Sequence, residues 1–109
     1  MKLVTDNAAG KSQGSGKALS RQKGARMIAA ATAGDGEACH GLGVAYSTAA
    51  GGLRDLIEAH KWFNLGALYG NEESAWCRAD ISAEMSRNEI AEAQRRAREW
   101  LGGEIRRAA

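Results

Sequence analysis

The sequence predicts an all-α protein in which about five helices pair as antiparallel hairpins. The first observation is composition: the 109 residues contain no proline and are rich in residues that favour helix, alanine above all. The second is spacing, because apolar side chains recur every three or four residues and β-branched residues never alternate with polar ones. The third is punctuation, since glycine, Asp or Ser residues separate these periodic segments.

One domain is expected, preceded by an arm. Residues 1–16 lack periodicity and are predicted to form a flexible basic arm, whereas residues 17–109 form a helical-repeat domain. Residues 1–33 carry six basic side chains against one acidic, and residues 34–85 carry three against eight. This asymmetry favours an acidic or polyanionic partner, or an arm that folds back on its own body.

The first two helices are bounded by glycines. The first is predicted over about residues 17–32 and ends at Gly34, and the second starts near Glu37 and ends at Gly51–Gly52. Each carries one apolar stripe that we expect to face the core. The stripes comprise Leu19, Met27, Ile28 and Ala31, and then Ala38, Leu42, Ala45, Tyr46 and Ala49.

The third helix has a start signal and a stop signal. Asp55 is its predicted N-cap, with Glu58 completing a capping box, and the helix runs to about Tyr69 before Gly70 stops it. Its aromatic pair, Trp62–Phe63, is expected to fill the core between hairpins.

A glycine lies inside this third helix. Gly66 should weaken the helix by roughly 1 kcal/mol relative to alanine, unless a close contact requires it.

The last two helices are rich in alanine. The fourth is predicted over NEESAWCRADISAEM, with Ala75, Ala79 and Ala83 inward and Trp76 as a further core candidate. Ser86 and Glu89 form a second capping box, which opens the last helix. The inward residues of that helix are expected to be Ile90, Ala93, Ala97, Trp100, Leu101 and Ile105.

The helices also repeat. Ala38 and Ala75 correspond at a shift of 37 residues, whereas Gly34 and Gly70 correspond at a shift of 36. Such periods indicate stacked helix hairpins that form a solenoid.

Two motifs lie within the most complete unit. The first, A-x3-L-G-x2-Y, and the second, G-G-L-x-D-x3-A-x2-W-F, comprise Ala38, Leu42, Gly43 and Tyr46, and then Gly51, Gly52, Leu53, Asp55, Ala59, Trp62 and Phe63. This pattern resembles the Sel-one-like repeat, a relative of the tetratricopeptide repeat, with one well-matched repeat at about residues 37–70. The resemblance implies a short right-handed solenoid with a C-terminal capping helix, and a role as an adaptor, scaffold or regulator that binds a partner protein.

The side opposite the core stripe is the candidate binding face. In the family that the sequence resembles, the first helices of successive hairpins line the concave face. At a shift of 37 residues, that expectation selects His40, Val44, Ser47, Cys77, Ile81 and Glu84. We expect these residues to form a semi-apolar groove for another protein, and self-association is also open.

A nucleic-acid-associated factor is the alternative function. Its polyanion contacts would come from the basic arm and the last helix, namely Lys11, Lys17, Arg21, Lys23, Arg95, Arg96 and Arg98. Interspersed glutamates in the last helix instead favour ion pairs on a solvated face, so we expect protein binding over nucleic-acid binding.

Catalytic chemistry finds little support. Cys39 and Cys77 have no CxxC or HxxxH context, so we expect no metal, no cofactor and no enzyme, although a small hydrolase with a cysteine nucleophile stays open. The segment GKSQGSGKA departs from a phosphate-binding loop, because five residues separate its outer glycines and Ala18 lacks a hydroxyl group. With no membrane span or secretory signal predicted, a cytoplasmic protein is expected.

Overall fold

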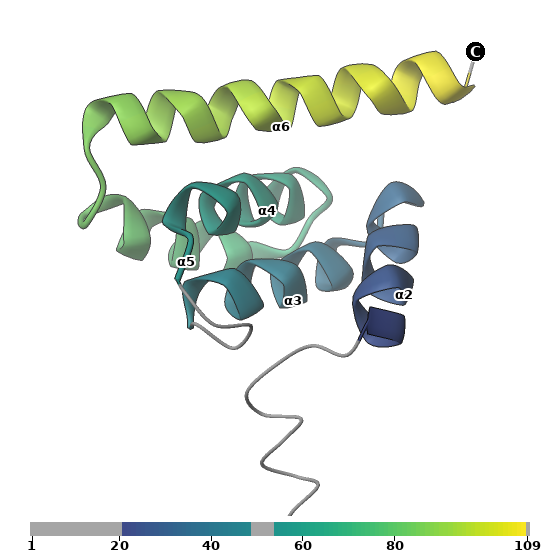
Figure 1. The fold of residues 1–109 in the computed structure, drawn as a ribbon, viewed down its shortest axis with the longest axis horizontal. Coiled ribbons are helices and arrows are strands. Elements are labelled where there is room, and N and C mark those ends of the chain that lie inside the picture. The colour runs from purple at the N-terminus through teal and green to yellow at the C-terminus, as the bar shows by residue number, and fades with distance from the viewer. Residues whose placement is uncertain (1–20, 49–53, 109) are drawn as a thin grey trace, which may run out of the picture.

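Five helices run through the residues that the structure describes. The computed structural model describes residues 21–48 and 54–108, with side chains up to residue 103. The helices are α2 (Arg21–Thr32), α3 (Gly36–Ser47), α4 (Leu56–Leu68), α5 (Glu72–Ser82) and α6 (Arg87–Ala108) (Figure 1). No strand occurs in these ranges, which confirms the all-α class. The predicted arm, the start of the first helix and the Gly51–Gly52 stop lie outside the described residues.

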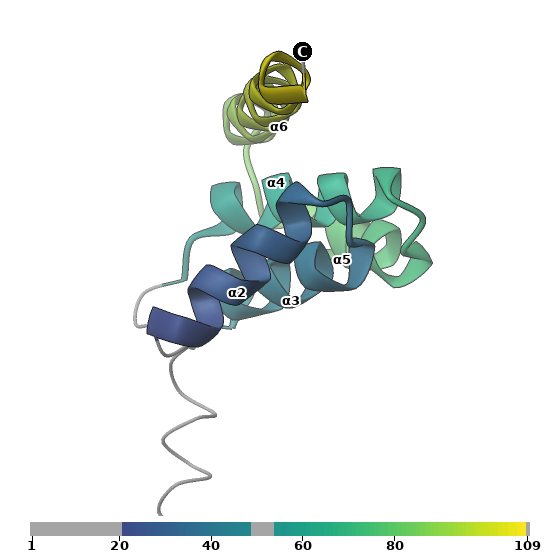
Figure 2. The ribbon, with the colours of Figure 1, turned by 90° about the vertical axis from the view of Figure 1, so that its right-hand side faces the viewer.

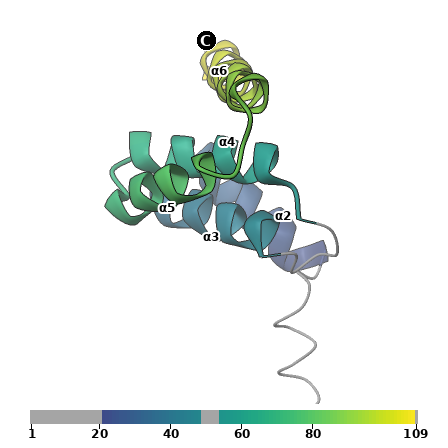
Figure 3. The ribbon, with the colours of Figure 1, turned by 90° about the vertical axis from the view of Figure 1, so that its left-hand side faces the viewer.

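α4 is the central helix. It packs against α3, α5 and α6, while α2 packs against α3, and α3 and α5 touch each other. Figures 2 and 3 show α3 between α2 and α5, with α6 on the far side of α4. The predicted core aromatics of α4 are buried, Trp62 at 3% exposure and Phe63 at 1%. The core therefore surrounds one helix.

The turns that enter α3 and α5 have the same geometry. Gly34 and Gly70 both adopt positive φ angles, 89° and 96°, which L-residues with a Cβ rarely tolerate. The residue after each glycine donates its backbone N–H to a carbonyl five residues back, Asp35 to Ala30 at 3.0 Å and Asn71 to Gly66 at 2.8 Å. Both predicted stops are confirmed. At a shift of 36 residues, α2 corresponds to α4 and α3 to α5.

The two predicted capping boxes differ in outcome. Ser86 and Glu89 form the complete box, because the Ser86 N–H donates to Glu89 at 2.8 Å and the Glu89 N–H donates to Ser86 at 3.1 Å. At α4, the Glu58 N–H donates to Asp55 at 3.1 Å, but the Glu58 carboxylate does not return the bond. It pairs instead with Lys61 at 3.1 Å and Arg96 at 2.7 Å.

The ion pair between Glu58 and Arg96 helps to hold α6 along α4. Beside Arg96, the Ala97 side chain is buried, and the rings of Trp62 and Trp100 meet edge to face with centroids 4.9 Å apart. The Lys61 ammonium lies 4.3 Å from the Trp62 ring centroid and adds a cation–π contact. α6 thus makes its main contact with α4 and does not form a hairpin with α5.

That position of α6 overturns part of the predicted core. Ala79 and Ala83 are exposed, and Trp76 is 67% exposed, because no described helix covers that side of α5. Tyr46 is exposed because it lies in the last turn of α3, at the edge of the contact with α4. Ile28 is exposed because Met27, one residue earlier, is the side chain that turns toward α3.

Two glycines set how closely the helices approach. A Cβ on Gly43 would lie 2.5 Å from the Phe63 ring. A Cβ on Gly66 would overlap the Ser74 hydroxyl and lie 3.3 Å from the Gly36 carbonyl. Gly66 is therefore required by a three-helix contact, which explains the glycine that the sequence left as a weak point of α4.

Replacing Gly66 with alanine should destabilise the protein, despite the higher helix propensity of alanine. The overlap with Ser74 predicts a loss of about 1–3 kcal/mol in the free energy of unfolding, measured by chemical denaturation. Gly24→Ala is the matched control, because a Cβ there meets nothing within 4 Å. It should raise stability by about 0.5–1 kcal/mol. A rise in stability for Gly66→Ala would contradict the packing described above.

Candidate protein-binding face

α3 and α5 lie side by side, and a polar contact joins them. His40 Nδ1 lies 2.9 Å from Ser74 Oγ, and the His40 ring packs against Phe63 with centroids 5.4 Å apart. The sequence placed His40 on an open groove. The structure instead seats it at the junction of the two helices, where only part of its ring is exposed.

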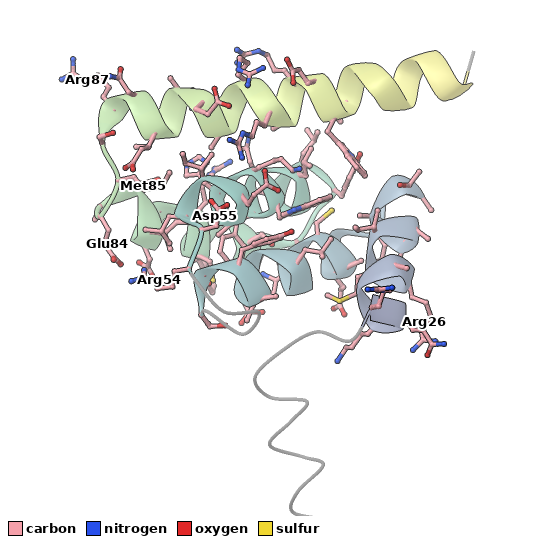
Figure 4. The ribbon with its side chains drawn as sticks, viewed as in Figure 1. Arg26, Arg54, Asp55, Glu84, Met85 and Arg87 are labelled. Atoms are coloured by element: carbon pink, nitrogen blue, oxygen red, sulfur yellow. The ribbon has the colours of Figure 1, made fainter. Side chains whose placement is uncertain are left out.

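Arg54 closes the other end of this junction. Its Nε–H donates to the Ser47 carbonyl at 3.1 Å, and its Nη2 donates to the Glu84 carboxylate at 3.1 Å. Figure 4 shows Arg54 and Glu84 close together at this end of the molecule. Sequence reasoning did not select Arg54. The available signal was a basic residue directly before the N-cap Asp55.

Ile81 was wrongly expected on the open face. Ile81 is 8% exposed and packs with Ala59 and Phe63, and Cys77 is half-buried against the same cluster. The error comes from the shift of 37 residues. The turns show that the structural shift is 36, and a displacement of one residue turns a helical side chain by about 100°.

Val44 remains as the exposed apolar residue of the predicted set, at 38% exposure. His40 precedes it by one helical turn, and Arg54–Glu84 borders the far end of the same helix. His40 Nε2 also lies 3.9 Å from the Glu73 carboxylate. Among the described residues, the face thus has one exposed apolar position, Val44, and a polar border.

A serine, a histidine and a glutamate meet at this junction, as in some acyl-transfer sites. Ser74, however, has no exposed surface, because its hydroxyl lies against Gly66. A nucleophile must reach its substrate. The Ser74–His40 contact therefore fits a structural link between α3 and α5.

Both cysteines are free and have raised pKa values. Burial, and then the charge of Asp35, raises the pKa of Cys39 to about 11. The pKa of Cys77 is raised by burial first, and then by Asp80 and Glu73. Thiolates act as nucleophiles and metal ligands, so these shifts disfavour both roles. Across residues 21–48 and 54–103, no three His, Cys, Asp or Glu side chains gather closely enough to hold a metal ion.

The arginines of α6 are engaged by carboxylates. Arg95 bonds Glu92 and Glu99, and Arg96 bonds Glu92 at 2.8 Å in addition to Glu58. Hydrogen bonds from Arg95 and Arg96 hold the pKa of Glu92 at about 2. Arg98 on α6 is exposed, as are Arg21 and Lys23 on α2. Lys11 and Lys17 lie outside the described residues.

The chain matches no protein-family model, no curated protein and no solved structure. The resemblance to the Sel-one-like repeat therefore stays a prediction. Within the described parts of the chain, no helix combines the length and the apolar character needed to cross a bilayer.

His60 is a buried histidine in the seam between α4 and α5. Its exposure is 3%, and its Nε2 lies 3.1 Å from the Ser82 hydroxyl oxygen. That hydroxyl donates to the Arg78 carbonyl at 2.7 Å, so its oxygen accepts the Nε2–H of His60. Burial, and then the positive charge of Arg78, lowers the pKa of His60.

Stability should therefore fall as the pH drops below about 6.5, the ordinary pKa of histidine. Between pH 6.5 and the lower pKa of His60 in the folded protein, the unfolded chain binds a proton that the folded chain does not bind. Below that folded pKa both states bind the proton, so stability falls no further. Unfolding free energies measured between pH 7.5 and 5 test this. His60→Gln keeps an N–H donor without a titrating ring, so its pH slope should be flatter. An unchanged slope would contradict the assignment to His60.

Proposed function

We propose that this protein is a non-catalytic protein-interaction module that presents the α3–α5 face, formed around Val44 by His40, Arg54 and Glu84, to a partner protein. The observation that carries the proposal is an exposed apolar residue, Val44, on a face whose polar border is fixed by internal contacts. His40 is held by Ser74, and Arg54 is held by Ser47 and Glu84. Side chains that are already ordered lose little entropy on binding, so such a face favours association.

The competing functions have weaker support. Nucleic-acid binding through α6 would have to separate Arg95 and Arg96 from carboxylates that they already contact. A hydrolase with a cysteine nucleophile would have to use thiols whose pKa values are raised. We also propose a cytoplasmic location, because free cysteines are typical of reducing compartments.

We also propose that the chain is related to the Sel-one-like repeat family, because the motif at residues 37–70 resembles that repeat. The repeated turns at Gly34 and Gly70 are in keeping with a repeat protein, since both end a helix in the same way. The role in protein–protein contact that the resemblance implies agrees with the α3–α5 face.

Val44→Glu should reduce partner capture while helix content stays intact. A charge at this position would be desolvated in an apolar contact, and a loss of about tenfold or more in affinity is expected. The measurement is quantitative affinity capture from the source cells, followed by titration of the captured protein. Ala91→Glu, on the exposed surface of α6, is the matched control and should capture as the wild type does. Equal loss for both variants, or none for Val44→Glu, would contradict the proposal.

Binding to DNA or RNA should be weak and non-specific. The engaged arginines of α6 predict little affinity at about 200 mM salt, measured by fluorescence anisotropy with short labelled duplexes and single strands. Tight binding that falls steeply between about 50 and 200 mM salt would instead support the nucleic-acid alternative.

A further inference from the structure

The outer side of α5 carries an uncovered apolar stripe. Trp76, Ala79 and Ala83 lie three to four residues apart and are exposed, whereas Ser74 and Ile81, on the opposite side, are buried. α3, which corresponds to α5, is covered by α2 on one side and by α4 on the other. α4 packs on α5 as α2 packs on α3, but no described helix packs on α5 as α4 packs on α3.

α2 has the pattern of a helix that could take that place. At the shift of 36 residues, Arg26 of α2 corresponds to Trp62 of α4, and Ala29 corresponds to Leu65. In α4, Trp62 and Leu65 are buried in the cluster that includes Cys39 of α3. In α2, Arg26 and Ala29 are exposed, because no described helix precedes α2. Figure 4 shows Arg26 on the outer side of α2.

The two surfaces have opposite charge. α2 carries Arg21, Lys23 and Arg26 and no acidic residue. The exposed charged residues on α5 are Glu72, Glu73 and Asp80, all acidic. Trp76, Glu72 and Glu73 line a shallow depression of about 400 Å³ at the start of α5.

We infer that α5 of one copy binds α2 of a second copy, head to tail. Ala79 and Ala29 allow the two helices to approach closely. The Arg26 guanidinium stacks on the Trp76 ring and faces the carboxylates of Glu72 and Glu73, which combines a cation–π contact with ion pairs. The second copy thereby supplies the hairpin partner that α5 lacks among the described helices of its own chain.

α2 and α5 lie on opposite sides of α3 (Figure 3). Two copies therefore cannot make the α2–α5 contact twice with each other about a two-fold axis. It is heterologous, and such contacts extend to rings or open chains. A single pair of helices buries less than the roughly 1,200 Å² of a stable interface, so association should be weak and should grow with concentration. The variants that test this contact leave Val44 unchanged, and Val44→Glu leaves α2 and the outer side of α5 unchanged, so the proposed function and this inference are tested by different variants.

Two blocking variants test the head-to-tail contact by sedimentation velocity of the full chain, up to about 1 mM. Wild type should grow in mass with concentration, and moderate salt should reduce that growth. Ala29→Arg blocks the α2 surface and Ala79→Arg blocks the α5 surface, so each alone should be monomeric. Mixed together, they retain one intact surface each and should form a one-to-one dimer that grows no further. Ala91→Arg, on α6, is the matched control and should associate as wild type does.

A monomeric wild type at the highest concentration would overturn the inference, and so would a mixture of the two variants that stays monomeric. Wild-type association by either single variant, or its loss in Ala91→Arg, would also overturn it. Circular dichroism checks that each variant folds. Arg26→Ala and Trp76→Ala, which remove exposed side chains without adding bulk, serve as second variants and should each weaken association about tenfold or more.

Discussion

The close approach of α4 to its neighbours is the constraint on which the rest of the structure depends. Gly43 of α3 makes room for the Phe63 ring, and Gly66 of α4 makes room for Ser74 of α5. Because both contacts involve a residue without a side chain, α3 and α5 can approach the same helix closely enough to touch each other. The His40–Ser74 contact, and with it the α3–α5 face, exists only at that separation. The absence of a Cβ at Gly43 and at Gly66 thus determines which side chains meet on the surface.

A second consequence follows from where Glu58 directs its charge. Its carboxylate, at the start of α4, reaches Arg96 of α6. The last helix therefore lies along α4, and one side of α5 has no described helix against it. The stripe of Trp76, Ala79 and Ala83 consequently faces outward. At the other end of the described helices, Arg26 and Ala29 of α2 are also exposed. The central contacts therefore fix the positions of the side chains around Val44, and the placement of α6 leaves one side of α5 without a described helix against it.

Much of the local structure could be predicted from sequence, because it depends on neighbouring residues. The stops at Gly34 and Gly70 and the box at Ser86–Glu89 follow from backbone chemistry that a short segment contains. The candidate site was harder, because it required the exact register between repeats. A shift of 37 in place of 36 selected Ile81, which is buried. The position of α6 could not be predicted, since the Glu58–Arg96 pair joins residues 38 apart and competes with a local capping bond that looks equally good in sequence.

The most direct test of this account is a double-mutant cycle on Gly66 and Ser74. The free energy of unfolding is measured by chemical denaturation for wild type, Gly66→Ala, Ser74→Gly and the double variant. If the contact between these residues sets the packing of α4 on α5, the cost of Gly66→Ala should largely disappear in the Ser74→Gly background, with a coupling energy of about 1 kcal/mol or more. Equal costs in the two backgrounds, within about 0.3 kcal/mol, would contradict it.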